Sequence, residues 1–300
     1  MNKILFSAVS LGLIGTLLVG CSNNASDSTG SSTSTISSTS QTGQSDVDKA
    51  LALINTFATG DTDLATSLLA SNYKQHNLTV ADGAEGFINA VEGLKAANVP
   101  VTVRNVRSFE DGKYVVLQNV YNFGAGDQVA FDIFRFDDAG KIAEHWDNLT
   151  DLASQPNPSG HTQIDGPTTV SDLDKTEVNR ELVKNFLFDV MQGNNPQKMP
   201  EYFDGDNYIQ HNTAIADGVS GLTAALGAMA EQGIEMKYNS VHMVLAQGDF
   251  VLAVSEGTLG NEPTAYYDLW RVENGKIAEH WDVVQAIPDS ATWQNQNGKF

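Results

Sequence analysis

The feature that most constrains this chain is an internal duplication. Three strings occur twice: GKIAEHWD at 140–147 and 275–282, Y-x-QHN at 73–77 and 208–212, and ADG at 81–83 and 216–218. All three keep an offset of 135 residues, which is too long for a solenoid repeat and typical of a duplicated domain. The sequence therefore predicts two tandem domains, at 46–154 and 175–300, joined by a linker at 155–174.

The N-terminus has the order of an exported lipoprotein. Lys3 is followed by an almost wholly apolar run that ends in LVGC, with Cys21 as the only cysteine of the chain. This ending is similar to a lipobox, in which the cysteine is diacylated and becomes the first residue. We predict a signal peptide at 1–20, a lipid anchor on Cys21, and a disordered Ser/Thr-rich tether at 21–45. The alternative is an uncleaved membrane helix, since the run approaches the ~18 residues that can span.

These features predict a protein at the cell envelope that is lipid-anchored to the membrane and faces outside the cytoplasm. The net charge of −20 disfavours nucleic acid as a partner, and it also disfavours direct docking on anionic lipid. The only membrane contact expected is therefore the anchor itself.

Apolar spacing predicts helices first and strands afterwards in each copy, which is an α+β plan. An amphipathic helix opens each copy, a short helix ends near Tyr73 or Tyr208, and a third helix follows the QHN segment. The strands predicted in the first copy are 101–106, 114–123, 130–136 and 142–148, and those in the second are 236–245, 250–258, 265–272 and 277–284.

The strings DLWRVENGKIAEHWD and YIQHN…ADG resemble the SnoaL-like polyketide cyclase group of the nuclear-transport-factor-two-like superfamily. The resemblance covers residues 46–154 and 175–300. It implies two cone-shaped domains, each a curved antiparallel sheet wrapped around about three helices and enclosing a pocket for a small apolar molecule. Because such cones commonly dimerise through their sheets, we expect the two domains to pack as an intramolecular pseudo-dimer.

Alternate residues of a strand share a face, so His145 and Asp147 point together, as do His280 and Asp282. The register of the hairpin decides which residues join them. A two-residue turn places Tyr267 opposite Asp282, whereas a loop longer by one residue places Asp268 there, and Asp132 opposite Asp147. The residues alone leave both registers open. The resemblance favours the second, since related cones carry acidic residues on both strands.

The functional interpretation of these residues is acid–base catalysis without a cofactor. The resemblance implies that an aspartate late on a pocket strand removes a proton beside a carbonyl group, and Asp147 and Asp282 match that position. The histidines would orient the substrate or polarise its carbonyl, and His76 and His211 are expected near the pocket mouth. The candidate catalytic residues are Asp147, His145, His76, Asp132, Asp282, His280, His211 and Asp268.

Several alternatives use the same residues. A buried His–Asp network can simply fix the sheet, because buried polar groups need partners. His76 with His145 and Asp147 also has the composition of a two-histidine, one-carboxylate metal site, although we expect no metal. At the level of the whole chain, the alternatives to an enzyme are a small-molecule binding module and a scaffold. His161, in the linker, is interpreted as a solvated residue.

Overall fold

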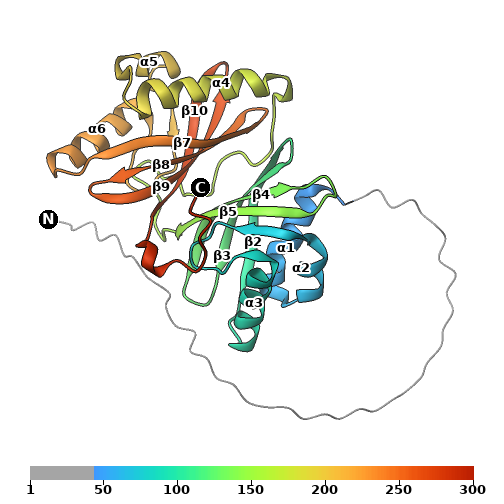
Figure 1. Cartoon of the computed structure of the whole chain (residues 1–300). Coiled ribbons are helices and arrows are strands. Elements are labelled where there is room, and N and C mark those ends of the chain that lie inside the picture. The colour runs from blue at the N-terminus through green and yellow to red at the C-terminus, as the bar shows by residue number, and fades with distance from the viewer. Residues whose placement is uncertain (1–43) are drawn as a thin grey trace, which may run out of the picture. The chain divides into compact units, whose positions relative to one another are not determined.

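Each copy of the repeat forms a set of helices that covers one face of a five-stranded sheet (Figure 1). The structure is a computed structural model and describes residues 44–300. The predicted signal peptide at 1–20, Cys21 and nearly all of the tether at 21–45 lie outside the described residues. Among the described helices, none is long and apolar enough to cross a membrane.

The first half begins with helix α1, whose start is fixed by a capping box between Ser45 and Asp48, and which ends at Gly60 in the left-handed conformation (φ 69°). The elements of this half are α1 Asp46–Thr59, α2 Thr62–Leu68, β1 Leu69–Gln75, α3 Gly83–Ala96, β2 Thr102–Asp111, β3 Tyr114–Asn122, β4 Asp127–Phe136 and β5 Ile142–Asp151.

The second half repeats this order with more irregular helices. Its opening helix continues into one turn of π-helix, and a short 3-10 turn precedes each of its first two α-helices. The elements are η1 Leu173–Lys175, α4 Thr176–Phe186, η2 Leu187–Met191, η3 Pro196–Lys198, α5 Met199–Tyr202, β6 Ile209–Gln210, α6 Gly218–Glu231, β7 Met236–Gln247, β8 Phe250–Leu259, β9 Glu262–Glu273, β10 Lys276–Ala286 and η4 Ser290–Thr292.

Four strands of each sheet are the predicted antiparallel meander, and a fifth was not predicted. The sheet orders are β1-β5-β4-β3-β2 and β6-β10-β9-β8-β7, and β1 and β6 pair parallel with β5 and β10. The short helix expected to end near Tyr73 ends instead at Leu68, because Leu69 to Gln75 extend along β5. This parallel edge strand places Gln75 of the QHN segment beside His145 of β5.

The register of the last hairpin combines both possibilities left open by the sequence. In the second half, Glu273 pairs with Lys276 across a two-residue turn, but a β-bulge at Ala278 then shifts the pairing by one residue. Asp282 therefore lies opposite Asp268, and Asp132 lies opposite Asp147 in the first half. The register that the resemblance favoured is confirmed.

The two faces of each sheet have different neighbours. The inner faces pack on the helices of their own half and form separate hydrophobic cores. The outer faces contribute to one shared cluster within the unit Gly43–Phe300. Its members are Phe109, Val116, Val129, Phe131, Ile133 and Trp146 from the first half, and Leu245, Phe250, Leu252, Val254, Ala265, Tyr267, Leu269, Trp281 and Val283 from the second.

The segments that leave the two sheets each cross to the opposite half, and we name them the crossing tails. Residues 152–167 follow β5, and their Asn157 amide donates hydrogen bonds of 2.6 and 3.0 Å to carbonyl oxygens at and after β6. Residues 287–300 follow β10, and Asn295 does the same after β1, at 2.7 and 2.9 Å. Each half is thus covered in part by chain from the other.

Candidate functional site

The β-bulges place one polar cluster on the inner face of each sheet, where an apolar core would otherwise continue. In the first half, His145 Nε2 lies 3.1 Å from Asp132 Oδ1, and its Nδ1 lies 3.2 Å from Gln75 Oε1. Asp147, directly opposite Asp132, accepts a 2.7 Å hydrogen bond from Asn77 through Oδ2. All three candidate residues are buried, with at most 5% of their surface exposed.

The second half repeats this geometry closely. His280 Nε2 lies 3.0 Å from Asp268 Oδ1, and its Nδ1 lies 3.0 Å from Gln210 Oε1. Asp282 accepts a 2.6 Å hydrogen bond from Asn212 through Oδ2. The structure therefore brings six of the eight predicted residues together in two triads. The glutamine and asparagine partners belong to the repeated QHN strings, although the sequence analysis singled out only the histidines.

The hydrogen bonds require each His–Asp pair to hold a proton. Backbone N–H groups donate to Gln75 Oε1 and Gln210 Oε1, so these oxygens are fixed as acceptors for the Nδ1–H of His145 and His280. The other ring nitrogen faces a carboxylate oxygen, which also accepts. A neutral imidazole has only one N–H, so a second hydrogen must lie on Nε2 or on the carboxyl group. Each pair is thus a buried histidine and carboxyl group joined through a hydrogen, beside a second aspartate.

His76 and His211 do not join these triads. Their rings lie on the outer side of the sheet, stacked on Trp146 and Trp281 with centroids 4.7 and 4.5 Å apart. The expectation that they lie at the pocket mouth is corrected by the strand alternation, which sends the QHN histidine to the face opposite that of His145. The metal set of His76, His145 and Asp147 is excluded for the same reason.

On this outer side each histidine lies beside a glutamate, which is partly buried at Glu144 and fully buried at Glu279. His76 Nε2 lies 3.0 Å from Glu144 Oε1, and His211 Nε2 lies 2.8 Å from Glu279 Oε1. Burial alone would raise the pKa of both glutamates, but hydrogen bonds from the histidine and from an arginine outweigh it and lower the pKa of each below its usual value. These carboxylates are ionised, and they hold the rings in place.

Comparison with protein families gives a match in each half of the chain. The SnoaL-like domain matches residues 50–145 and 183–280, which together make up more than half of the sequence. The chain belongs to the SnoaL-like domain family. A comparison with curated proteins gives no match.

Solved structures resemble one SnoaL-like domain at a time. A putative polyketide cyclase from Bacillus cereus is 22% identical, with 35% of this chain and 73% of that chain covered and a TM-score of 0.31. Wild-type IdmH, a putative polyketide cyclase from Streptomyces antibioticus, is 19% identical, with 35% of this chain and 92% of that chain covered and a TM-score of 0.31. A putative ketosteroid isomerase from Kribbella flavida is 14% identical, with 37% of this chain and 81% of that chain covered and a TM-score of 0.30.

The two SnoaL-like domains complete their triads with tyrosines from different strands. In the first domain, Tyr121 on β3 donates its hydroxyl to Asp132 Oδ2 at 2.9 Å. The matching residue of the second domain is Gly257, where an added Cβ would lie 1.7 Å from a backbone oxygen of β7. Tyr238 on β7 supplies the hydroxyl instead, 3.1 Å from Asp268 Oδ2. Neither Tyr121 nor Tyr238 has a tyrosine at the matching position of the other copy, so the sequence analysis missed this role.

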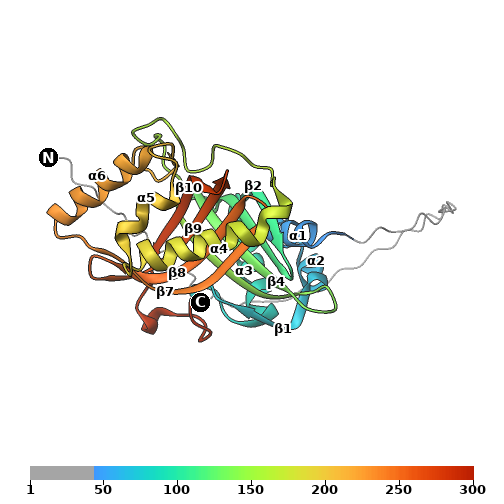
Figure 2. The ribbon, with the colours of Figure 1, turned by 90° about the horizontal axis from the view of Figure 1, so that it is seen from above.

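The two domains also differ in the side chains that occupy the space between the helices and the sheet. Aromatic rings fill the first domain: Phe57 lies 4.8 Å from Phe87 in a tilted pair and 6.0 Å from Phe123 in an edge-to-face pair, centroid to centroid. The residues that match Phe87 and Val91 in the second domain are leucines on α6, and these are only half-buried. Figures 1 and 2 show α6 extending away from α4 and α5, whereas α3 lies against α1 and α2.

The second aspartate of each triad, Asp147 or Asp282, differs in exposure between the two domains. Asp147 is buried, its Oδ1 has no hydrogen-bond partner, and Lys299 Nζ from a crossing tail lies 3.8 Å away. Asp282 is partly exposed, and among the described residues its Oδ1 accepts no hydrogen bond. Burial raises the pKa of Asp282, and the neighbouring Asp268 adds to this, against the lowering effect of His280. Asp282 is therefore the most accessible member of its triad, and its pKa is raised above the usual value of an aspartate.

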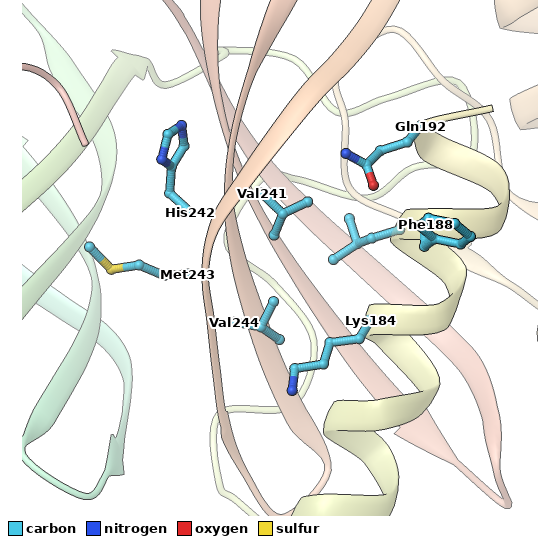
Figure 3. Close-up of a pocket in the computed structure, with 8 residues that line it drawn as sticks. Lys184, Phe188, Gln192, Val241, His242, Met243 and Val244 are labelled. Atoms are coloured by element: carbon cyan, nitrogen blue, oxygen red, sulfur yellow. The ribbon is translucent and has the colours of Figure 1, made fainter. Parts of the chain in front are cut away.

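A surface groove lies apart from both triads, between β7 and the helices α4 and η2 (Figure 3). Figure 3 shows Val241 and Val244 on the side of β7 toward the helix that carries Lys184 and Phe188, whereas His242 and Met243 lie on the other side of the strand. None of the eight predicted site residues lines this groove, so it is not the pocket that the sequence predicts.

Proposed function

We propose that the second SnoaL-like domain carries out cofactor-free acid–base chemistry on a small, largely apolar carbonyl compound. The observation that carries the proposal is the carboxyl group of Asp282. It is the one member of its triad that is partly exposed, its Oδ1 accepts no hydrogen bond among the described residues, and its pKa is raised. A base needs a free lone pair and an affinity for protons near the working pH.

In the proposed step, Asp282 Oδ1 removes a proton from a carbon next to the carbonyl group. The C–H bond breaks, an O–H bond forms on Asp282, and the electron pair moves into the enolate. Returning the proton to a different carbon isomerises the compound. In the other branch the enolate carbon forms a bond to a second carbonyl carbon, whose oxygen becomes an alkoxide and takes the proton back from Asp282, which gives an aldol product or a ring. No oxidant or reductant enters this balance.

The remaining residues are proposed to position the base. Asn212 holds Asp282 Oδ2, so the free oxygen has a fixed direction. His280 and Asp268 retain their shared proton beside it, which compensates part of the negative charge of the triad. In the first domain, Asp147, His145 and Asp132 have the same geometry. In that domain the interior is filled by aromatic side chains and Asp147 is buried, which favours a structural role for this triad.

A binding module without turnover is the second candidate. It is favoured by the number of internal hydrogen bonds in the triads, since Asp268 and His280 use both of their polar atoms within the protein. Such saturation is typical of a fixed polar network rather than of groups that exchange protons with a ligand.

The two candidates differ in whether bound carbonyl compounds exchange protons. We would incubate the protein in deuterated buffer with a panel of 1,3-diketones, β-keto esters and α,β-unsaturated ketones, and follow the α-hydrogen signals by NMR. Exchange faster than with heat-denatured protein supports the enzyme. Ligand line broadening without accelerated exchange supports the binding module.

We further propose that the chain is an extracytoplasmic lipoprotein anchored through Cys21, supported by the LVGC ending of the apolar run. Cys21→Ala should release the protein from membranes or leave an uncleaved precursor, because the acylated residue is lost. Membrane fractionation and the mass of the mature chain measure this. A variant with unchanged fractionation and mass would contradict the proposal.

We also propose that the two domains form a pseudo-dimer about an approximate twofold axis, supported by the shared outer-face cluster and the crossing tails. The outer surfaces that such cones use for dimerisation would then be consumed within the chain. Residues 44–300 should therefore be a monomer by light scattering at micromolar concentration. A stable dimer, or small-angle scattering from two freely tumbling lobes, would contradict this.

A further inference from the structure

A third cluster of titratable residues lies outside both triads, where the first crossing tail meets the second domain. It consists of His161 and Asp165 from the tail and His211 from the domain, whose candidate ligand atoms lie within 4.8 Å of one another. His211 Nδ1 lies 2.7 Å from Asp165 Oδ1, and His161 Nδ1 lies 3.4 Å from Asp165 Oδ2. His161 is thus not the solvated linker residue that the sequence suggested.

Both rings are held by carboxylates at their other nitrogen. His211 Nε2 lies 2.8 Å from Glu279 Oε1, and His161 Nε2 lies 3.2 Å from Asp217 Oδ2. In metal sites the ligating histidine almost always gives its second N–H to a carboxylate or carbonyl, which fixes the tautomer and points the free nitrogen at the ion. Here the same arrangement occurs twice and directs both Nδ1 atoms toward Asp165.

The tail loop is also pre-organised around this point. Asn157 Oδ1 accepts 2.9 Å hydrogen bonds from the backbone N–H groups of Ser159 and His161, and Thr162 N donates to Asp165 Oδ1 at 3.0 Å. His211 is fully buried, whereas the side chain of Asp165 is 42% exposed. One side of the cluster is therefore fixed by the core, and the other is open to an entering ion.

We propose that His161 Nδ1, His211 Nδ1 and the carboxylate of Asp165 form a binding site for a divalent transition-metal ion such as zinc. Two imidazoles and one carboxylate are ligands that such ions prefer. Ligand atoms about 2.1 Å from a tetrahedral zinc lie roughly 3.4 Å apart, close to the separation of His161 and Asp165. A water would complete the set, and the ion would replace the hydrogen through which His211 Nδ1 now contacts the carbonyl oxygen of Thr162, at 2.8 Å.

The first domain provides an internal contrast. The tail motif N-x-x-G recurs at 295–298, but Lys299 follows it where His161 follows the first motif. Within residues 44–300, the hydrogen-bond partner of His76 Nδ1 is accordingly a carbonyl oxygen, that of Gly298 at 3.0 Å, and not a carboxylate. The proposed ion would therefore bind the first crossing tail to the second domain, and the second crossing tail would have no such site. Metal binding would thus be specific to the segment between the two domains.

The test is calorimetric titration of chelator-treated residues 44–300 with zinc chloride, together with the visible absorption of the cobalt(II) form. We expect one equivalent per chain and a rise in melting temperature on zinc addition. His161→Ala and Asp165→Asn should each weaken zinc binding at least tenfold and remove the melting shift. Asp165→Asn keeps the side-chain shape, so it serves even where truncation of His161 disturbs the loop.

His242→Ala is the matched control, because His242 also pairs with a carboxylate, Glu256 at 3.0 Å, but lies on β7 outside the cluster. Its affinity and cobalt spectrum should equal those of the parent chain. The proposal is overturned if the parent chain takes up no zinc, or binds several equivalents weakly as any acidic surface does. It is equally overturned if both cluster variants retain the parent affinity, since the ion then lies elsewhere.

Discussion

Asp282→Asn is expected to lower the rate of α-proton exchange by about 10²–10⁴-fold, the usual contribution of a positioned general base, while it preserves or raises the melting temperature. The amide has the same shape, and its oxygen can take the place of Asp282 Oδ2 as the acceptor for Asn212, but the amide cannot remove a proton. The rate is measured by the NMR exchange assay, and the stability by thermal melting over a range of pH.

The direction of the stability change follows from the raised pKa of Asp282. A carboxyl whose folded pKa lies above its unfolded value of 3.8 destabilises the fold when it ionises. This penalty is absent well below pH 3.8 and grows as the pH rises through the folded pKa. The Asn variant should therefore gain stability relative to the parent chain at neutral pH, and the gain should shrink in acid.

Asp147→Asn is the matched comparison from the other domain. It removes the negative charge 3.8 Å from the buried Lys299, so we expect a loss of roughly 1–3 kcal/mol in the free energy of unfolding, with exchange retained. The two substitutions thus shift the melting temperature in opposite directions. A clear drop in melting temperature in both variants, with ligand binding unchanged, would end the catalytic assignment and leave a structural network.

Arg107→Ala is expected to cost about 3–5 kcal/mol in the free energy of unfolding, the largest stability loss that we predict. The guanidinium is buried and lies 4.3 Å from the ring centroid of Trp281. It donates to the side chain of Gln118 and to three backbone carbonyl oxygens. Those acceptors belong to Ile164, Asp165 and Pro167 in the first crossing tail.

Truncation would leave these buried acceptors without their donor, and it would remove the packing of the guanidinium on the indole ring. Burial lowers the pKa of Arg107 to about 10, although Glu279 and Asp165 oppose the shift, and the group stays charged at neutral pH. Urea denaturation followed by tryptophan fluorescence measures the loss. Arg104→Ala, at an exposed position of the same strand, should change stability by under about 0.5 kcal/mol. Equal losses in both variants would refute the argument.

The repeat, the α+β plan and the paired faces of the last hairpin follow from sequence, because apolar periodicity and the duplicated strings encode them. The bulges at Ala143 and Ala278 do not, since an alanine gives no local signal of an extra residue. Strand β1 was missed because its pairing with β5 is distant in sequence.

The candidate site, like the fold, could be predicted only in part from the sequence. His145, Asp147 and their copies share a face by simple alternation, so the two triads could be anticipated. The outward turn of His76 depended on the unpredicted β1. The exchange of Tyr121 for Tyr238 between strands could not be found by aligning the copies, because the hydroxyl groups meet only in space.

The crossing tails imply that the duplication cannot be undone by deleting one copy. Each half ends in a segment whose asparagine satisfies carbonyl groups of the other, and Asn148 of the first half also donates to carbonyl oxygens of Ala265 and Val283 in the second, at 3.0 and 2.7 Å. Loss of either copy would leave polar backbone groups without donors on one half and an unbound tail on the other. Recombination between the repeats would thus give an unstable single-copy chain, and two sequences that began as duplicates are now inherited as one folding unit.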